Sequence, residues 1–218
     1  VVMTLTTQGD APIHYTLDGS EPTAASPRYT GPVEIGKSAR FRATALREGG
    51  ENASYSREFA FSKSTGRPAV LNTKPNDSYT FEGASLLVDG YHSRPVFTSG
   101  AWLGYLDEPL DVTIDMGGEQ SYRSVELETL AEKGDWIFPP SSVTVWVSDN
   151  GTDFTEVASV TVPEAKAGDA DGIGRYRMQF PETSARYLKV VAQNAAAIPA
   201  WHPGAGSKGF LFVDEVVV

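Results

Sequence analysis

Tyr15 to Pro22 reads YTLDGSEP, and this stretch is the strongest single indication of how the chain folds. Four residues that suit a β-strand run into Asp18-Gly19. This dipeptide favours a tight hairpin turn, because glycine, and tolerably aspartate, accept a positive φ. The stretch therefore predicts two short antiparallel strands joined by a tight turn, with Asp18 shaping the turn.

The same rhythm of short strands continues along the chain. Apolar and polar residues alternate in many runs, and 21 glycines and 14 prolines punctuate them. The clearest runs are Ile13, Tyr15, Leu17; Phe41, Ala43, Ala45; Val112, Ile114, Met116; and Val143, Val145, Val147. A period of two over short segments is typical of an all-β sandwich, with almost no helix. Ser124 to Lys133, where the glutamates would also suit a helix surface, is predicted as a strand that ends in a loop.

The organisation along the chain indicates two domains. The chain has 218 residues, and the run SKSTGR between Phe61 and Pro68 is polar, contains glycine and lacks any strand pattern. We therefore expect a small β-sandwich over residues 1–62 and a larger one over residues 66–218. The first is small enough to be marginal alone, whereas the second can bury its own core.

Composition excludes several classes of function. A net charge of −10 disfavours nucleic acid and anionic membrane surfaces as partners. The absence of cysteine excludes disulfides, thiolate catalysis and zinc-thiolate sites, but says nothing about the compartment. With 40% hydrophobic and 21% charged residues, the chain is expected to fold as an ordinary globular protein.

The sequence contains no apolar window long enough for a membrane span, so no membrane insertion is expected. The first ten residues, VVMTLTTQGD, lack the basic start and the apolar core of a signal peptide. A chain that opens on an alternating strand is typical of a piece of a longer protein. Function must then be inferred for a part.

Six strings in the second half occur together in one order. They are LVDG at residues 87–90, GAWLGY at 100–105, VTIDMG at 112–117, VTVWVSDNGTDF at 143–154, ARYLKVV at 185–191 and FVDEVVV at 212–218. In order and spacing they resemble the discoidin or coagulation factor C-type domain, which overlaps carbohydrate-binding module family 32. The resemblance implies a discoidin-like jelly-roll sandwich with ligand loops at one end and a structural calcium ion.

YTLDGSEP, with Ser26 to Tyr29 after it, resembles the small Ig-like sandwich found behind the catalytic domain of chitobiases and β-N-acetylhexosaminidases. WIFPP at residues 136–140 and PAWHPGAGSKGFLFVDE at 199–215 resemble the discoidin-like version attached to glycoside hydrolase family 20. The resemblance implies a non-catalytic C-terminal piece of an exported hexosaminidase. It would bind or position glycans, of N-acetylhexosamine or galactose type, for the parent's catalytic domain. Two alternatives stay open: a purely structural role in stabilising the catalytic barrel, and cell-surface adhesion.

The calcium shell is implied in part by the resemblance. It assigns the carbonyl oxygen of Leu86, the turn residue Asp89 and Glu215 on the final strand as ligands, and calcium prefers such oxygens. Ser93 is a further candidate in the following loop. A sodium ion, a water or a salt bridge could occupy the same place, or Asp89 could only shape a turn while Glu215 faces solvent.

Asp214-Glu215 is adjacent in the same way as the catalytic pair of family 20 enzymes. On a strand, however, neighbouring side chains point to opposite faces, so the two should not converge on one sugar. The chain also lacks the alternating strands and helices of an α/β barrel. We expect no catalysis by this piece.

Glycan contacts are expected from aromatic and hydrogen-bonding residues in loops, since a sugar has an apolar face and hydroxyls that need fixed partners. The candidates are Tyr91, His92, Trp102, Trp136, Trp201 and His202. Burial in the core is the competing interpretation, and it is favoured for Trp102 and Trp136. Trp201-His202, between two prolines in a glycine-rich loop, is the best candidate for exposure.

Overall fold

The computed structural model describes residues 1–47, 49 and 51–218. They divide into two compact units, Val1–Phe61 and Ser62–Val218. Both units are built from strands, and the helical segments of the described chain are short 3-10 turns. The prediction of an all-β fold of sandwiches is therefore confirmed. None of the helices described is long and apolar enough to cross a membrane.

The first unit consists of two small sheets. Strands β1 (Val2–Met3) and β3 (Val33–Glu34) form one, and β2 (Ile13–Thr16), β4 (Ala39–Ala45) and β5 (Ala53–Phe59) form the other in the order β2-β4-β5. All neighbouring strands are antiparallel. The alternating side chains of β4 and its neighbours enclose the core, which is formed by Met3, Ile35, Phe41, Ala43 and Phe59.

The expected tight hairpin at Asp18-Gly19 is wrong. Such a turn needs a positive φ at both central residues, and of the two only Gly19 has one, at 85°. The segment that pairs with β2 lies further along the chain, at residues 27–29. The Tyr29 N–H donates to the Ile13 carbonyl at 2.8 Å, and the Tyr15 N–H donates to the Pro27 carbonyl at 3.0 Å. Residues 17–26 form the loop between them.

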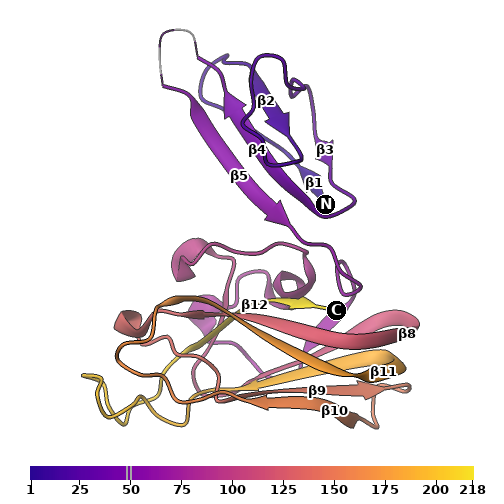
Figure 1. Ribbon diagram of the computed structural model, residues 1–218, viewed down its shortest axis with the longest axis vertical. Coiled ribbons are helices and arrows are strands. Elements are labelled where there is room, and N and C mark those ends of the chain that lie inside the picture. Colours follow the sequence, from indigo (N-terminus) through magenta and orange to yellow (C-terminus); the bar gives the residue numbers. More distant parts are fainter. Residues whose placement is uncertain (48, 50) are drawn as a thin grey trace. The chain divides into compact units, whose positions relative to one another are not determined.

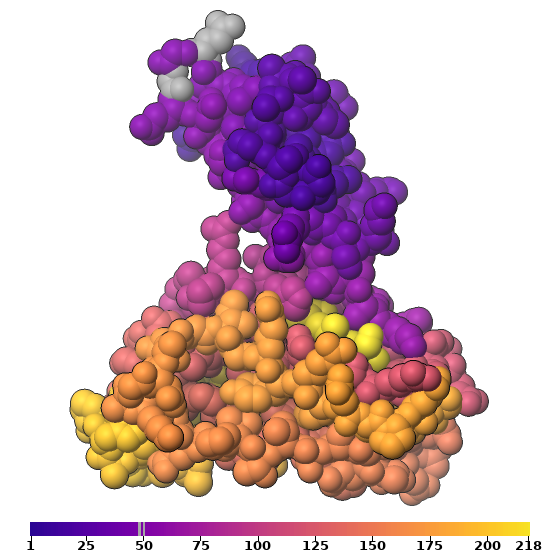
Figure 2. Space-filling view, viewed as in Figure 1, coloured from indigo at the N-terminus to yellow at the C-terminus, as the bar shows by residue number. Residues whose placement is uncertain are grey.

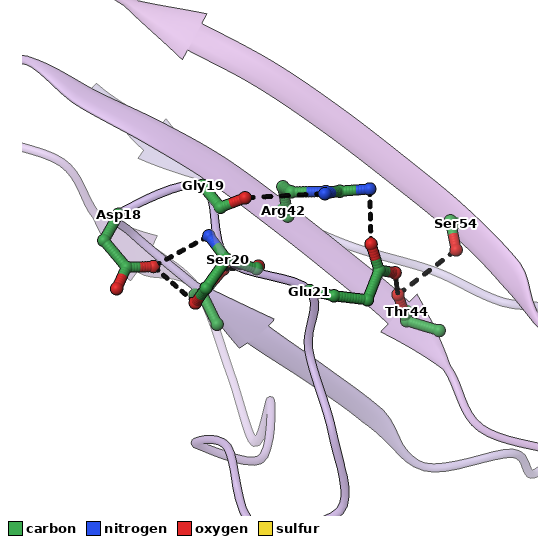
Figure 3. A network of polar contacts seen from close by, with 8 residues as sticks. Asp18, Gly19, Ser20, Glu21, Arg42, Thr44 and Ser54 are labelled. Atoms are coloured by element: carbon green, nitrogen blue, oxygen red, sulfur yellow. Dashed lines mark hydrogen bonds and ion pairs between the residues drawn. The ribbon is translucent and has the colours of Figure 1, made fainter.

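Side chains hold this loop together (Figure 3). The Asp18 carboxylate accepts from the backbone N–H of Ser20 at 2.9 Å and from its hydroxyl at 2.6 Å, and these bonds lower the pKa of Asp18. On the neighbouring strand, Arg42 pairs with Glu21 at 2.5 Å and donates to the Gly19 carbonyl at 3.4 Å. YTLDGSEP therefore shapes a loop.

The second unit has one seven-stranded sheet that folds over on itself. Its strands are β6 (Ala69–Leu71), β7 (Leu103–Tyr105), β8 (Leu110–Ala131), β9 (Ser142–Ser148), β10 (Thr155–Thr161), β11 (Gly172–Gln193) and β12 (Leu211–Val217). The order is β10-β9-β11-β8-β12-β7, with β6 beside β8. The expected strand over Ser124 to Lys133 is the second half of β8, and the 3-10 turn η4 (Lys133–Asp135) follows it.

The two long strands β8 and β11, of 22 residues each, run through both layers of this sandwich (Figure 1). Their pairing shifts register between Gln179 and Thr183 and again between Ala185 and Tyr187, which lets both strands bend. In one layer the first half of β8 pairs with the second half of β11, β11 pairs with β9, and β9 pairs with β10. The other joins the second half of β8 to β12 and β7. The main core fills the space between the layers, with Val112, Ile114, Leu127, Val145, Leu188 and Val213 among its fully buried residues.

A second, smaller core lies on the outer side of β8 and β12. Three further 3-10 turns, η1 (Asp77–Tyr79), η2 (Gly83–Val88) and η3 (Phe97–Ser99), belong to the segment before β7. Trp102, at the end of this segment, packs with Leu130, Ile137 and Phe212. This core holds the long segment of residues 76–102 against the sheet.

Candidate functional site

Two half-exposed tryptophans, Trp136 and Trp201, are brought together around one histidine. Trp136 is 42% exposed and Trp201 is 40% exposed. The His202 ring packs edge-on to both, with centroids 6.1 Å from Trp136 and 5.5 Å from Trp201. Phe138 completes the group at 5.5 Å from His202 and 6.4 Å from Trp201. We call Trp136 and Trp201 the tryptophan platform.

The platform is built by loops that the long strands carry at one end of the sandwich. Trp136 follows η4 in the β8–β9 connection, and Trp201 belongs to the β11–β12 connection, which lies at the lower left of Figure 2 in yellow. Its indole N–H donates to the Ala165 carbonyl of the β10–β11 connection at 2.9 Å. Three loops far apart in the sequence therefore meet at this place.

Trp136 is held out toward solvent by a strained backbone. Its φ of 64° and ψ of 26° lie in the left-handed region, which costs an L-residue roughly 1–2 kcal/mol. Its N–H bonds the Lys133 carbonyl at 3.0 Å, and a Cβ built on Gly204 would lie only 2.8 Å from its indole Cζ2. Gly204 thus leaves the space in which the indole lies. Backbone strain of this kind concentrates at functional sites.

His202 is an anchor of the platform and not a ligand contact, contrary to the expectation from sequence. It is 8% exposed. Its Nδ1 accepts from the Gly204 N–H at 3.1 Å, so the proton is on Nε2, which donates to the Lys133 carbonyl at 2.9 Å. With both ring nitrogens occupied, His202 has no hydrogen bond left for a sugar.

Lys133 connects the same loops through buried polar contacts. The residue is 7% exposed, and its ammonium forms an ion pair with Asp171 and donates to the Asp169 carbonyl at 2.9 Å. Together with the bond from His202 to its carbonyl, Lys133 joins all three connections. The tryptophans therefore stand on a polar network that fixes their position.

A groove of about 410 Å³ opens beside the platform. Its walls are Phe138, Pro139, Pro140, Ser141, Val162, Pro163, Glu164, Ala165, Ala195, Ala196, Ala197, Ile198, Pro199 and Ala200. This size is within the range of small-molecule sites in proteins. The groove was not predicted, because prolines and alanines that are far apart in the sequence form it together.

The other three predicted glycan contacts lie in different surroundings. Trp102 has no exposed surface, and its indole N–H donates to the Arg94 carbonyl at 2.9 Å, so it cannot contact a ligand. His92 is mostly buried, with Nδ1 2.9 Å from the Glu128 carboxylate. Tyr91 is partly buried, and its backbone N–H bonds Asp89 at 2.7 Å. None of the three belongs to the tryptophan platform.

Asp214 and Glu215 are both buried against the same loop, which corrects the expectation that they point to opposite faces. Glu215 accepts from the Gly90 N–H at 3.2 Å, and Asp214 accepts from the Ser93 N–H at 2.8 Å. The reason is a register shift in β12 between Val213 and Val216, which breaks the strict alternation. Glu215 has no exposed surface, so the alternative in which it faces solvent is also wrong.

This pair is the centre of a cluster of carboxyl groups that also contains Asp89 and Glu128. Burial raises the pKa of Asp214 to about 8, and burial with the charges of Asp89 and Asp214 raises the pKa of Glu215 to about 10. Glu128 pairs with Arg175 at 2.8 Å. Sequence analysis did not single out Glu128, because its role depends on packing across β8 and β11.

The residues expected to hold calcium fit a cation in one respect. The Oε2 atom of Glu215 is buried without a hydrogen-bond partner, so this oxygen could coordinate a cation. Leu86 is buried in η2, and Asp89 caps the same turn. The Ser93 hydroxyl donates to the Ala101 carbonyl at 3.2 Å. Among the described residues there is no group of three or more His, Cys, Asp or Glu side chains placed to hold a metal, so an ion here would need backbone carbonyls as well.

Comparison with solved structures finds many similar chains. Chitosan-binding module 1 of a chitosanase/glucanase from Paenibacillus sp. IK-5 is 16% identical over 71% of this chain and 96% of that one, with a TM-score of 0.44. The CpGH89CBM32-5 module of Clostridium perfringens, solved with GalNAc-β-1,3-galactose, is 16% identical over 68% and 91%, with a TM-score of 0.44. A GH29 fucosidase of Ruminococcus gnavus is 11% identical over 72% and 26%, with a TM-score of 0.45.

Comparison with family models finds two matches in succession. Residues 3–59 match the model described as Fn3 associated, and residues 72–208 match the F5/8 type C domain. No curated protein matches the chain. The second match alone covers more than half of the chain and includes the tryptophan platform and the groove.

Proposed function

The chain belongs to the F5/8 type C domain family, and from this premise we propose that its second unit binds glycans on the tryptophan platform. The observation that carries the proposal is the exposure of Trp136 and Trp201 at adjacent loops. Aromatic rings with open faces are the surfaces on which the apolar side of a sugar stacks. Because the buried polar contacts of His202 and Lys133 hold the loops in place, the Trp136 and Trp201 rings lose little conformational freedom when a ligand binds.

The proposed role is binding without catalysis. The adjacent carboxyl groups Asp214 and Glu215 are both buried and bonded to a loop, so neither is placed to meet a sugar. A module of this kind raises the local concentration of an enzyme on its substrate by linkage. We expect weak affinity for a single sugar, in the millimolar range.

The parent protein is proposed to be an exported β-N-acetylhexosaminidase of glycoside hydrolase family 20. The support is the resemblance of YTLDGSEP, WIFPP and FVDEVVV to the accessory region of those enzymes. Sugars of N-acetylhexosamine or galactose type are then the first ligands to test, and the catalytic domain is the expected partner. The complete coding sequence of the protein tests this proposal, because it should also encode an α/β barrel. Absence of such a barrel from the same protein contradicts the proposal.

Calorimetric titration with N-acetylglucosamine, N-acetylgalactosamine and galactose tests glycan binding. Trp136→Ala and Trp201→Ala should each weaken binding about fivefold or more, since stacking on an aromatic ring is worth roughly 1–3 kcal/mol. Phe81→Ala is the matched control, because Phe81 is equally exposed, at 46%, and lies outside the platform. The absence of heat with every sugar would instead favour the purely structural role or adhesion.

We also propose that a calcium ion is held by the Leu86 carbonyl, Asp89 and Glu215, where it would tie the loop after η2 to the last strand. The ion would neutralise the buried carboxylates and supply structure only. Adding calcium should raise the melting temperature of the chain, and a chelator should reverse the rise. Glu215→Gln should abolish the response. A melting temperature that is independent of calcium in the unsubstituted chain refutes the proposal.

A further inference from the structure

The walls of the groove beside the platform carry almost no side chains that form hydrogen bonds. Of the residues that line it, only Ser141 and Glu164 have polar side chains. The Ser141 hydroxyl already donates to the Asn194 carbonyl at 2.8 Å, and Glu164 is exposed. The remaining walls are proline, alanine, valine, isoleucine and phenylalanine.

A sugar ring is a poor occupant for such a groove. Each hydroxyl that leaves water without a new partner costs free energy, and these walls offer few partners. A hydrocarbon group has no such cost and gains from leaving water. The groove therefore suits an apolar group, and its volume of about 410 Å³ has room for a short hydrocarbon chain.

The groove and the platform are parts of one surface. Trp201 bonds the carbonyl of Ala165, which is a wall residue, and packs against Phe138, which is another. The Trp201 ring thus stands at the rim, although it does not line the groove. A ligand that stacks a sugar on Trp201 can extend an attached group directly into the groove.

We propose that the groove binds a hydrocarbon substituent of a glycan whose sugar ring stacks on Trp201. The inference rests on the proposed function and names its ligand class: glycans that carry an apolar group, in place of plain polyhydroxylated sugars. The same chemistry has two sources, an apolar aglycone at the anomeric oxygen and an acyl chain on an amino or hydroxyl group of the sugar.

Two ligand series test the inference and distinguish these sources. One consists of methyl, propyl, butyl and hexyl β-glycosides of N-acetylglucosamine, and the other of glucosamine N-acylated with acetyl, butyryl and hexanoyl groups. Full burial of one methylene is worth about a fourfold gain in affinity. We expect at least a tenfold rise from the first to the last member of one series, and the series that rises identifies the source.

Charge placed in the groove should remove this dependence on chain length. Ala197 and Ala200 are exposed wall residues, so Ala197→Asp and Ala200→Asp should both fold. In each variant the affinity should no longer rise with the length of the apolar group, while the shortest ligand binds as before. Ala167→Asp is the matched control, because Ala167 is an exposed residue of the β10–β11 connection but is not itself a wall residue of the groove.

The outcomes separate the two proposals. If the shortest ligands bind and Trp201→Ala abolishes this, but affinity is flat across both series, the groove inference fails while the proposed function stands. If affinity rises equally in Ala197→Asp, Ala200→Asp and the control, the groove is not the binding place and the inference is overturned. If no member of either series binds, the groove inference is overturned, and the proposed function fails with it if N-acetylgalactosamine and galactose do not bind either.

Discussion

Gly204→Ala should displace Trp136 without disturbing the backbone. An alanine Cβ at this position would lie 2.8 Å from the Trp136 Cζ2 and 3.0 Å from its Cη2, well inside normal carbon contact distances. The backbone at Gly204 is not in the left-handed region, so alanine itself is tolerated there. The half-exposed indole is the group that must move.

The expected cost follows from that geometry. Overpacking typically costs 1–3 kcal/mol, and the indole can swing toward solvent, so we expect about 1 kcal/mol. For a unit of this size that corresponds to a fall in melting temperature of roughly 2–4 °C, measured by circular dichroism. Sugar affinity should fall with it, because the ring leaves its place in the platform.

A double-mutant cycle isolates the contact. In a Trp136→Ala background the obstacle is gone, so Gly204→Ala should cost almost nothing, which gives a coupling free energy of about 1 kcal/mol. Gly206→Ala is the matched control in the same loop. Its φ of 83° strains any other residue but nothing lies within 4 Å of the new Cβ, so its cost should not depend on Trp136. If Gly204→Ala is equally costly with and without Trp136, the reasoning about the platform is refuted.

Three further predictions concern the framework around the site. Trp102→Ala should destabilise the chain by about 3–5 kcal/mol in urea unfolding, because it empties a fully buried position; a cost under 1 kcal/mol contradicts the assignment of Trp102 to the core. Arg186 lowers the pKa of Asp115 to about 2, below its value in an unfolded chain. The free energy of unfolding of the chain should therefore exceed that of Asp115→Asn above about pH 5, and this difference should disappear as the pH falls toward 2. A difference that does not change over this range contradicts the ion pair between Asp115 and Arg186. Lys133→Met should cost about 1–3 kcal/mol, because the buried bonds to Asp171 and to a backbone carbonyl are lost, and the fluorescence of the platform tryptophans should report the loosened loops; unchanged fluorescence and stability contradict its role as their support.

The strand framework could be predicted from the sequence because it depends on a local pattern. Val143, Val145 and Val147 recur at every second position, and in β9 these valines are buried in the core while the two residues between them are only partly buried. The same reasoning placed a strand before Lys133, where β8 continues to Ala131. A period of two survives in the structure wherever the pairing is regular.

The errors occurred where the pairing is irregular. No glycine or proline marks the register shift between Val213 and Val216, so the common orientation of Asp214 and Glu215 was not visible in the sequence. The Asp18-Gly19 dipeptide satisfies the composition of a tight hairpin, yet the conformation of Asp18 excludes it. In both places the local backbone geometry, which the pattern of side chains does not record, decided the outcome.

The candidate site was only partly predictable because exposure is a tertiary property. Trp102 and Trp136 both follow a glycine by two residues, but Trp102 is fully buried in a core and Trp136 is half-exposed. What separates them is the shape of their neighbours: Trp102 packs among large apolar side chains, whereas Trp136 lies over Gly204. The sequence shows Gly204 but not that it lies beneath Trp136.

The proposed ligand binding and the structural support therefore use different residues of the same loops. The buried groups His202 and Lys133 satisfy their hydrogen bonds within the protein, so the platform and the groove present mainly rings and apolar walls. Such a surface gains affinity from stacking and from hydrocarbon burial more than from hydrogen bonds. Its selectivity should then depend on the apolar face and the substituents of a glycan, so sugars that differ in one equatorial hydroxyl should be separated less sharply than sugars that differ in an attached apolar group.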